Sequence, residues 1–469
     1  MKLFTHMVLG MAGLTLAGCA DFVDIKTQGA ATPNEIKNYR YLLNNSQNFS
    51  GGPGIPDIAS DDIELVDGTQ QVNDLLKSDY QGYWMRTYKW EPEIYPIGQY
   101  QKDAAYDALY NSIIVANVII NEAPASRDGN DSIKNEVVAE ARVHRADAYL
   151  MLVNMYAKPY TATSASTDLG MPIVLESNTT QSLKRPPLQE NYDLIIDDLT
   201  KALPYLPETQ QYNTLPCKAS AYAELARTYL CMGDYEKANE NADKALETRS
   251  TLNDLSTIEA LAAGNNYPTR LTNPEILLSK IAVEGISAYT PTAFRLSQNL
   301  LDLLGTKDKR YTLFTTGYAT VSANYTDAGG RYFYQDQALG EARNIGPTVP
   351  EMMLIKAEYY ARSGDAEKAM EWVNKLRVKR FSATDYVPLT ATDGKDALKK
   401  VIDERHREFF CRMLRWWDMR RLNNDPDFQK TLTRTVEGKQ YTLAPNSERY
   451  VFKIAPYQIT LNPEMQQNP

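Results

Sequence analysis

Small, apolar and aromatic residues recur in the same order in two distant segments, 216–248 and 351–377. In the first segment these positions are Tyr222, Leu225, Ala226, Tyr229, Gly233, Tyr235, Ala238, Ala242 and Ala245. In the second they are Met353, Ala357, Tyr360, Gly364, Ala366, Ala369, Val373 and Leu376. The pattern predicts two antiparallel helices in each segment, because small residues let helices approach closely and a glycine suits the turn between them.

This spacing is typical of tetratricopeptide repeats, in which pairs of helices stack side by side. A third pair is split, with one predicted helix at 136–156 and its partner at 190–203. The segment 157–187 between them is rich in Pro, Thr and Ser and is predicted to be an insertion. Helical periodicity also covers 103–122 and 395–422.

Three stretches lack this rhythm, namely 44–100, 250–345 and 423–469. They are rich in Gly, Pro, Asn, Thr and Tyr, which predicts loops with short strands. Loops held on a rigid scaffold often carry binding groups. We therefore predict one mainly α body over 19–469, in which a tetratricopeptide-like helical scaffold carries a loop-rich, irregular second layer.

Composition supports a folded protein and argues against some partners. Hydrophobic residues make up 43% of the 469 positions and charged residues 23%, as in ordinary globular proteins. The net charge of -9 repels phosphate backbones, so we expect no nucleic-acid partner. The chain has 31 Tyr but only 11 Phe, which favours rings whose hydroxyl tolerates a wet surface and indicates a binding face.

The N-terminal segment predicts secretion. An apolar run from Met7 to Ala17 follows Lys2 and is too short to span roughly 30 Å of hydrocarbon, so residues 1–18 are predicted to be a signal peptide. Leu16-Ala17-Gly18-Cys19 resembles the lipobox of a bacterial lipoprotein, which implies that Cys19 becomes the lipidated first residue. The alternative is an ordinary signal peptide with an incidental cysteine. A lipidated Cys19 would anchor the chain on a membrane without spanning it.

The metal-binding residue types are too sparse to predict a metal site or a cofactor. Histidine occurs only at His6, His144 and His406, without zinc-ligand spacing. Cys217 and Cys231 lie about 21 Å apart along one predicted helical pattern, so they cannot bridge each other.

Several ordered motifs carry a family resemblance. Glu404-Arg405-His406-Arg407-Glu408-Phe409 precedes Arg415, Trp417-Asp418 and Arg420. Further upstream come Leu109-Tyr110 to Asn117, Arg145-Ala146 to Tyr149, and Tyr192 to Leu206-Pro207. With Cys19 and Asp21-Phe22 at the start and Ile454-Ala455-Pro456 in the tail, they resemble the SusD/RagB family of outer-membrane nutrient-uptake lipoproteins. Two departures are Arg412-Met413, where the family usually has Glu-Gly, and Ala157, where it commonly has Gly.

The resemblance implies a non-enzymatic, lipid-anchored protein that faces outward from the outer membrane. It would bind oligosaccharide and deliver it to a TonB-dependent, SusC-like β-barrel. Three alternatives stay open: a peptide-binding uptake lipoprotein, a lipid-anchored glycoside hydrolase with a carboxylate pair, and a scaffold without a small ligand. The chain has no G-x-S-x-G, H-E-x-x-H or P-loop motif, which favours binding over catalysis.

Two irregular segments concentrate aromatic rings, which can stack on the apolar face of a pyranose. The first holds Tyr80, Tyr83, Trp84, Tyr88, Trp90, Tyr95 and Tyr100, and the second holds Tyr311, Tyr318, Tyr325, Tyr332, Phe333 and Tyr334. We predict ligand contacts from both segments, at Trp84, Arg86, Tyr88, Trp90, Tyr325 and Tyr332. The alternative for each ring is that it packs its loop onto the helices.

Two charged clusters are interpreted structurally. The acidic run Asp57, Asp61, Asp62, Glu64 and Asp67 lacks the alternating acids of an EF-hand calcium loop, so a solvated acidic loop is predicted. Arg405, Glu408, Arg412 and Arg415 fall on one face of the helix predicted at 395–422, where they are expected to satisfy one another's hydrogen bonds. Trp416 and Trp417 are predicted to pack in the core.

Overall fold

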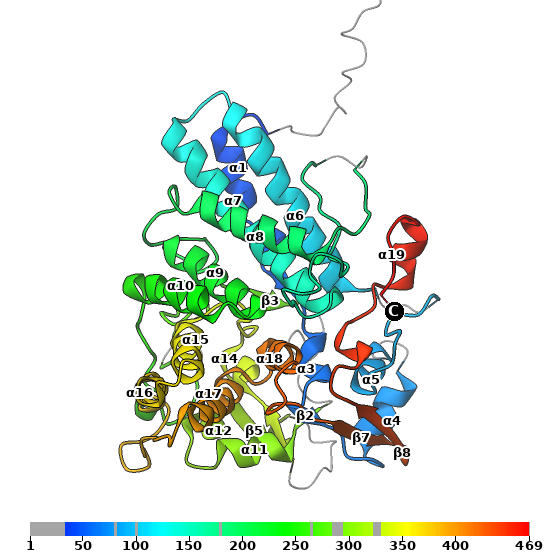
Figure 1. The fold of residues 1–469 in the computed structure, drawn as a ribbon, viewed down its shortest axis with the longest axis vertical. Coiled ribbons are helices and arrows are strands. Elements are labelled where there is room, and N and C mark those ends of the chain that lie inside the picture. Colours follow the sequence, from blue (N-terminus) through cyan, green and yellow to red (C-terminus); the bar gives the residue numbers. More distant parts are fainter. Residues whose placement is uncertain are drawn as a thin grey trace, which may run out of the picture.

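The computed structural model describes residues 33–78, 82–98, 102–177, 181–262, 266–283, 294–321 and 330–468. The predicted signal peptide, Cys19 and Tyr325 lie outside these residues, as do Tyr80 and Tyr100. Long helices occupy one end and one side of an elongated body, with the short helix α1 (Ile36–Asn44) beside α7 (Asp131–Tyr156), and most of the other short helices and the strands lie toward the opposite end (Figure 1). The predicted mainly helical fold class is confirmed.

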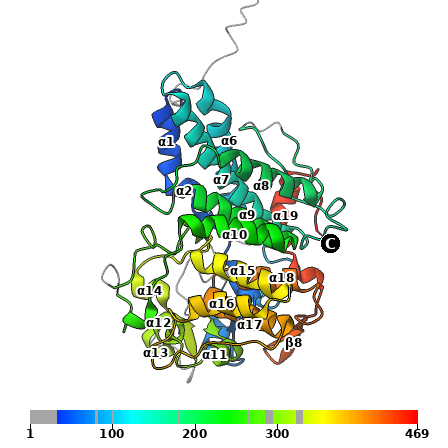
Figure 2. The same ribbon diagram turned by 60° about the vertical axis from the view of Figure 1, so that its left-hand side comes forward.

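The long helices pack against one another in chain order. They are α6 (Ala104–Glu122), α7 (Asp131–Tyr156), α8 (Leu188–Ala202), α9 (Lys218–Met232), α10 (Tyr235–Thr248), α15 (Val349–Arg362), α16 (Ala366–Arg377), α17 (Gly394–Phe409) and α18 (Leu414–Leu422). α7 packs on α6 and α8, α10 joins α9 to α15, and α15 packs on α16 and α17. Figure 2 shows these helices stacked one on the next, from α6 to α17. Helices thus occupy the ranges that the periodicity predicted, while their assignment as tetratricopeptide repeats stays a prediction.

Two of the helix pairs share one turn chemistry. Gly233 between α9 and α10 has φ 77°, and Gly364 between α15 and α16 has φ 87°. Such left-handed backbone suits glycine because it has no Cβ. The next residue, Asp234 or Asp365, then caps the second helix by accepting a hydrogen bond from a backbone N–H in its first turn. The repeated Gly-Asp pair therefore determines where the first helix of each pair ends and the second begins.

Short helices fill much of the sequence between the long ones. They are α1 (Ile36–Asn44), α2 (Ser46–Phe49), α3 (Ile55–Ala59), α4 (Gln70–Lys77), α5 (Gly82–Tyr88), α11 (Gln298–Leu304), α12 (Lys309–Phe314), α13 (Tyr318–Val321), α14 (Gln335–Leu339) and α19 (Pro456–Leu461), with 3₁₀ turns at Ala123–Ala125, Leu255–Thr257 and Glu448–Tyr450. The segments 44–100 and 250–345 were predicted as loops with short strands, and the structure adds these helices. Helices this short are held by tertiary packing and show no readable period, as in α3, where all residues are buried.

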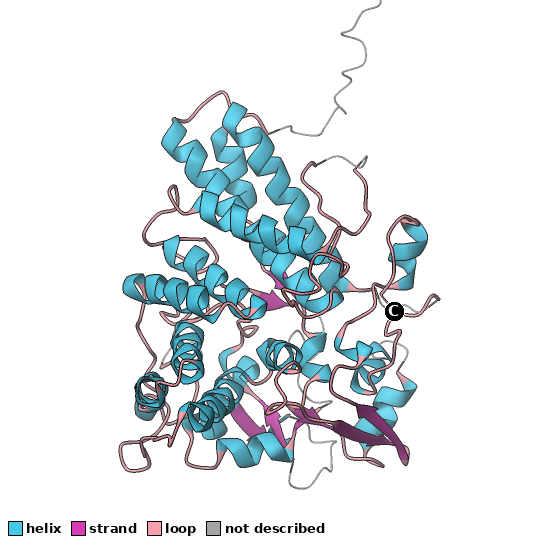
Figure 3. Cartoon of the chain, viewed as in Figure 1, coloured by secondary structure: helices cyan, strands magenta, loops and turns pink. Residues whose placement is uncertain are grey.

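The strands are short and gather mainly at the end opposite α1 (Figure 3). β1 (Gly51–Gly52) pairs in parallel with β3 (Ile281–Ala282), so that Gly51 lies opposite Ile281. The other pairs are antiparallel: β2 (Ile63–Glu64) with β4 (Arg295–Leu296), β5 (Thr315–Gly317) with β6 (Arg331–Phe333), and β7 (Leu432–Val436) with β8 (Lys439–Leu443). Their registers place Ile63 opposite Leu296, Thr315 opposite Phe333 and Leu432 opposite Leu443.

The C-terminal helix predicted at 395–422 is two helices, α17 and α18. Cys411 and Met413 between them have φ values of 53° and 71°, which interrupts helical geometry. Asp62 accepts a hydrogen bond from the Cys411 N–H at 2.8 Å, and Asp57 accepts one from the Met413 N–H at 2.6 Å. Because these bonds satisfy the N–H groups at the break, the acids hold it in place.

The predicted solvated acidic loop is therefore wrong for most of the run. Asp57 and Asp62 are buried, and Asp61 forms an ion pair with Arg415 at 2.6 Å. Glu64 is half-buried and pairs with Arg295 at 2.7 Å, so Asp67 is the one exposed acid of this run.

The arginine-rich helix is structural, as predicted, but its partners come from elsewhere in the fold. Arg405 pairs with Asp418 of α18 at 2.8 Å, and Glu408 accepts hydrogen bonds from Arg310 and Arg380 at 2.6 and 2.8 Å. Arg412 donates to Gln335 of α14 at 2.6 Å. The predicted mutual pairing on one helical face is thus wrong, because the break after Phe409 redirects the last two arginines.

One large apolar core runs through the body, with two smaller clusters beside it. Trp416 and Trp417 are both buried in it, as predicted, and the Trp416 ring stacks on Tyr450 with centroids 5.1 Å apart. Among the described residues, no helix combines the length and apolar character needed to cross a bilayer.

Candidate functional site

The predicted aromatic contacts Trp84 and Tyr88 lie on α5 and face the core. Both rings are buried and tilt against Phe294, with centroid distances of 5.9 and 5.8 Å. The Tyr88 hydroxyl accepts a hydrogen bond from the Leu65 N–H at 2.9 Å. The helix thus brings two predicted residues together, but as packing groups against Phe294.

Trp90 follows α5 and is also enclosed, with 6% of its surface exposed. Its Nε1–H donates to the Ala59 carbonyl at 2.9 Å. The Arg434 guanidinium of β7 lies 4.2 Å from the Trp90 ring centroid and 4.0 Å from that of Tyr88. The two rings therefore flank a buried cation and leave no open face for a sugar.

Two further predicted contacts are engaged within the fold. Tyr332 is buried and accepts a hydrogen bond from Gln71 of α4 at 3.1 Å, while Arg86 donates to the Ile94 carbonyl at 2.9 Å. Tyr325 lies outside the described residues. Ligand contact by this set stays a prediction, and in this structure the described rings serve packing.

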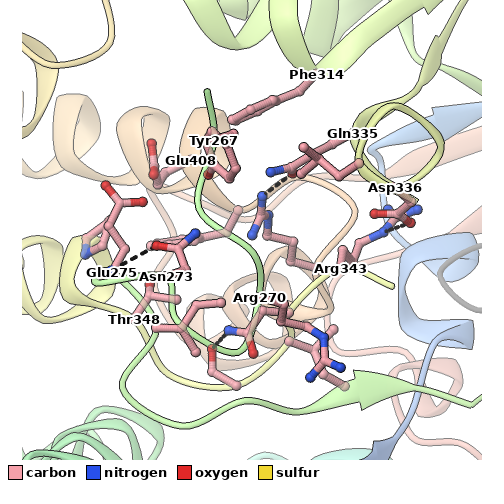
Figure 4. Close-up of a pocket in the computed structure, with 18 of the residues that line it drawn as sticks. Tyr267, Arg270, Asn273, Glu275, Phe314, Gln335, Asp336, Arg343, Thr348 and Glu408 are labelled. Atoms are coloured by element: carbon pink, nitrogen blue, oxygen red, sulfur yellow. Dashed lines mark hydrogen bonds and ion pairs between the residues drawn. The ribbon is translucent and has the colours of Figure 1, made fainter. Parts of the chain in front are cut away.

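A polar slot lies between α14, α15 and α17 (Figure 4). Tyr267 and Phe314 form part of its wall. Arg343 donates to Asp336 Oδ2 at 2.8 Å, and Arg412 donates to Gln335 at 2.6 Å, while Asp336 Oδ1 has no hydrogen-bond partner among the described residues. The slot measures about 60 Å³. Small-molecule pockets measure roughly 300–1,000 Å³, so the slot is too small for a saccharide.

A much larger groove, the α17–α18 groove, follows those two helices and measures about 800 Å³. Its rim carries charges of both signs, and pairs such as Lys395 with Asp427 at 2.8 Å neutralise one another. Asp61 and His406 line this groove, and together with the buried Asp62 they place ligand-type atoms within 4.8 Å of one another.

This acidic corner does not fit a metal ion. Burial raises the pKa of Asp61, but Arg415 and its hydrogen bonds outweigh burial and hold that pKa well below its usual range. Arg415 binds both Asp61 oxygens, at 2.6 and 2.9 Å. Asp62 is likewise engaged, by His406 at 2.8 Å and by the Cys411 N–H. A guanidinium at this distance repels a cation, and the carboxylate oxygens already have partners.

A third concavity, the C-terminal groove, measures about 720 Å³. It lies between the loop after α7, the end of α18, the segment around the last 3₁₀ turn, and the chain's tail. Amide and hydroxyl side chains dominate its lining: Asn423, Asn424, Asn446, Gln466, Gln467, Asn468, Thr161, Ser164, Thr167 and Ser447. Four charged side chains complete the polar part of the lining: Lys158, Asp168, Arg420 and Glu448.

The fold fixes one wall of this groove through Asn468 and leaves other amides available. Asn468 donates to the Tyr156 and Phe452 carbonyls at 2.8 and 2.9 Å, which holds the tail against α7. Asn424, Asn446 and Gln466 are exposed, and among the described residues their side chains have no hydrogen-bond partner.

Such a lining suits a ligand covered with hydroxyl groups. An amide side chain offers an acceptor oxygen and two N–H donors, so it can pair with a hydroxyl in either role. The volume lies within the usual range for ligand pockets. Tyr450 and Asn423 line both this groove and the α17–α18 groove, so the two concavities share a wall.

The sequence patterns did not single out the C-terminal groove. Its lining comes from four separate segments, 158–169, 420–424, 446–451 and 466–468, and in the sequence only the polar runs Asn423-Asn424 and Gln466-Gln467-Asn468 point to it. Such polar runs are common in ordinary loops, so the signal was weak.

Comparisons with known proteins agree along most of the chain. A family described as "Starch-binding associating with outer membrane" matches residues 21–230, and one described as "SusD family" matches residues 349–469. SusD-like protein P2 of Formosa agariphila is 26% identical over 370 residues, which cover 68% of this chain and 71% of the relative. SusD-like protein P38 of the same organism is 23% identical over 388 residues, covering 68% and 72%.

Solved structures share the fold at low sequence identity. A SusD superfamily protein from Bacteroides thetaiotaomicron superposes with a TM-score of 0.71 at 18% identity, covering 93% of this chain and 100% of that one. A putative sugar binding protein from Bacteroides vulgatus gives a TM-score of 0.67 at 18% identity, covering 94% and 99%.

Proposed function

The chain belongs to the SusD/RagB family, and from this premise we propose that it binds oligosaccharide without cleaving it. The observation that carries the proposal is the C-terminal groove, whose amide and hydroxyl lining matches the donors and acceptors of a sugar. The name of the Bacteroides vulgatus structure, a putative sugar binding protein, supports the same ligand class.

The proposal includes a location and a partner. The chain sits on the outer membrane through a lipid on Cys19 and passes its ligand to a TonB-dependent, SusC-like β-barrel. The matching family description, which names association with the outer membrane, supports the location.

A binding experiment on the chain from residue 19 onward tests the proposal. Isothermal titration with oligosaccharides of defined composition should show saturable binding, and no new reducing ends should form during incubation. Asn424→Ala and Gln466→Ala each remove an exposed amide from the groove and should weaken binding severalfold, because each loses hydrogen bonds to the ligand.

Gln211→Ala is the matched control, since Gln211 is an exposed amide that lines neither groove. Release of reducing ends would support the glycoside hydrolase alternative. Saturable binding of peptides without any saccharide binding would support the peptide alternative and refute ours.

A further inference from the structure

Arg420 of α18 is a buried cation with unsatisfied donors. Only 2% of its surface is exposed, and it lines the C-terminal groove. Its Nη2 donates to the Ala157 carbonyl, while Nε and Nη1 have no hydrogen-bond partner within the described part of the chain. Buried guanidinium groups normally pair with an anion or have all their donors satisfied, so this arrangement is unusual.

A second buried arginine lies behind the same groove. Arg185 is 8% exposed and donates to the Asn468 side chain at 2.8 Å and the Gln466 carbonyl at 3.1 Å, both on residues that line the groove. Its other contacts are the carbonyls of Gly170, Tyr156 and Leu169. Its hydrogen-bond partners among the described residues thus include no carboxylate.

Neighbouring arginines show the contrast. Arg421, the residue after Arg420, binds both carboxylate oxygens of Glu358 at 2.7 Å, and Arg405 pairs with Asp418 at 2.8 Å. The Asp418 carboxylate, two residues before Arg420, is therefore already paired with Arg405 and Arg421. The fold balances those charges and leaves Arg420 and Arg185 unbalanced.

The acids of the groove do not compensate for the two cations. Asp168 pairs with Lys158 at 3.0 Å and accepts a hydrogen bond from Ser164 at 2.6 Å. Glu448 is exposed at the rim. Burial lowers the pKa of Arg420 and Arg185 to about 10, so both keep their charge at neutral pH. In a chain of net charge -9, the groove therefore has a locally positive wall.

We propose that the C-terminal groove selects an acidic oligosaccharide, whose carboxylate or sulfate group lies against the wall formed over Arg420 and Arg185. The amides hold the sugar hydroxyls, and the two buried cations favour the anionic substituent. This inference rests on the proposed oligosaccharide-binding function and adds the ligand class.

Electrostatics sets the expected size of the preference. An anionic oligosaccharide should bind at least tenfold more tightly than a neutral one of equal length at low ionic strength, a difference of about 1.4 kcal/mol. The preference should shrink as salt rises, because the anion lies at the solvent-open side of the wall.

The test titrates the chain from residue 19 onward with an oligouronate, a sulfated oligosaccharide and a neutral oligosaccharide of the same length. The two acidic arms distinguish carboxylate from sulfate. Asn424→Asp adds a negative charge at an exposed groove position and also removes the N–H donors of the amide, so it should weaken the binding of both ligand classes, and that of the acidic ligands about tenfold more than that of the neutral one. Gln211→Glu adds the same charge outside both grooves and should change neither.

A second variant addresses the buried charge directly. Arg420→Gln should remove most of the acidic preference, whereas Arg420→Lys, which keeps the charge, should retain more of it. If Arg420→Gln fails to fold, the effects of Asn424→Asp on acidic and on neutral binding still test whether the groove prefers an acidic oligosaccharide.

Equal or tighter binding of the neutral oligosaccharide overturns the inference and leaves the proposed function standing. Equal weakening of neutral and acidic ligands by Asn424→Asp overturns it as well. Absence of binding to all three saccharides refutes the proposed function itself, and binding of an acidic peptide alone assigns the positive wall to a different ligand.

Discussion

Replacement of Trp90 by alanine separates ring packing from sugar stacking. The side chain is enclosed, its Nε1–H donates to the Ala59 carbonyl at 2.9 Å, and its ring covers the Arg434 guanidinium. Deleting a buried tryptophan costs about 3–5 kcal/mol, and the lost hydrogen bond and cation–π contact place Trp90→Ala near the upper end. We expect a loss of about 5 kcal/mol in the free energy of unfolding.

That loss translates into a measurable change in melting temperature. The entropy of unfolding is about 2.1 cal/mol/K per residue, or about 1 kcal/mol/K for a chain of this length, so Tm should fall by about 5 °C. Scanning calorimetry gives Tm, and titration well below Tm gives the affinity for oligosaccharide. Because the ring has no open face, the affinity should not change.

Trp90→Phe is the matched control. It keeps an aromatic ring against Arg434 but removes the donor to Ala59, so it should cost about 1–2 kcal/mol. An unchanged Tm for Trp90→Ala together with weakened sugar binding would refute this reasoning and restore Trp90 as a ligand contact.

Three further predictions concern acid stability, packing and anchoring. Burial raises the pKa of Glu404, but Arg310 and neighbouring arginines outweigh it and lower that pKa to about 2. The folded pKa of Glu404 thus lies below its unfolded value of about 4.3. About 3 kcal/mol of stability present above pH 4.3 should therefore be lost as pH falls to 2. Urea titrations of Glu404→Gln should show a free energy of unfolding that depends less on pH over this range. Gly346→Ala would place its Cβ against the Leu278 carbonyl oxygen and should cost more than about 2 kcal/mol, whereas Gly317→Ala, with open space around it, should change stability little by the same titration. Cys19→Ala should move the protein from the membrane fraction to the soluble fraction, and its retention with membranes would contradict the lipid anchor.

The helices were predictable because their signals are local. The apolar period and the Gly233-Asp234 turn are visible within about thirty residues, and the structure places α9 and α10 there. The break after Phe409 was not visible, because its cause lies in Asp57 and Asp62, more than 300 positions away. The acidic run from Asp57 to Asp67 was predicted to be solvated for the same reason: the partners that bury most of it lie far away in the sequence.

The candidate site was less predictable than the fold. Tyrosine and tryptophan are equally suited to a wet surface and to a core. Composition alone therefore could not show that Trp84 and Trp90 are buried in the core and do not lie at a ligand-binding surface. The C-terminal groove arises only when the tail and the loop after α7 meet, through contacts such as Asn468 to Tyr156. The sequence likewise cannot show that Nε and Nη1 of Arg420 lack hydrogen-bond partners among the described residues, because this depends on which groups surround them in the fold.

The hydrogen bonds from Cys411 and Met413 to the two early aspartates also constrain how the protein matures. A nascent chain that has reached α10 already carries Asp57 and Asp62, but the N–H groups that satisfy them have yet to be synthesised. The core around α3 therefore cannot close until translation nears its end, and contacts across so long a stretch form slowly. Fragments cut to the two matched segments, 21–230 and 349–469, would each carry half of this junction and should be insoluble when expressed separately.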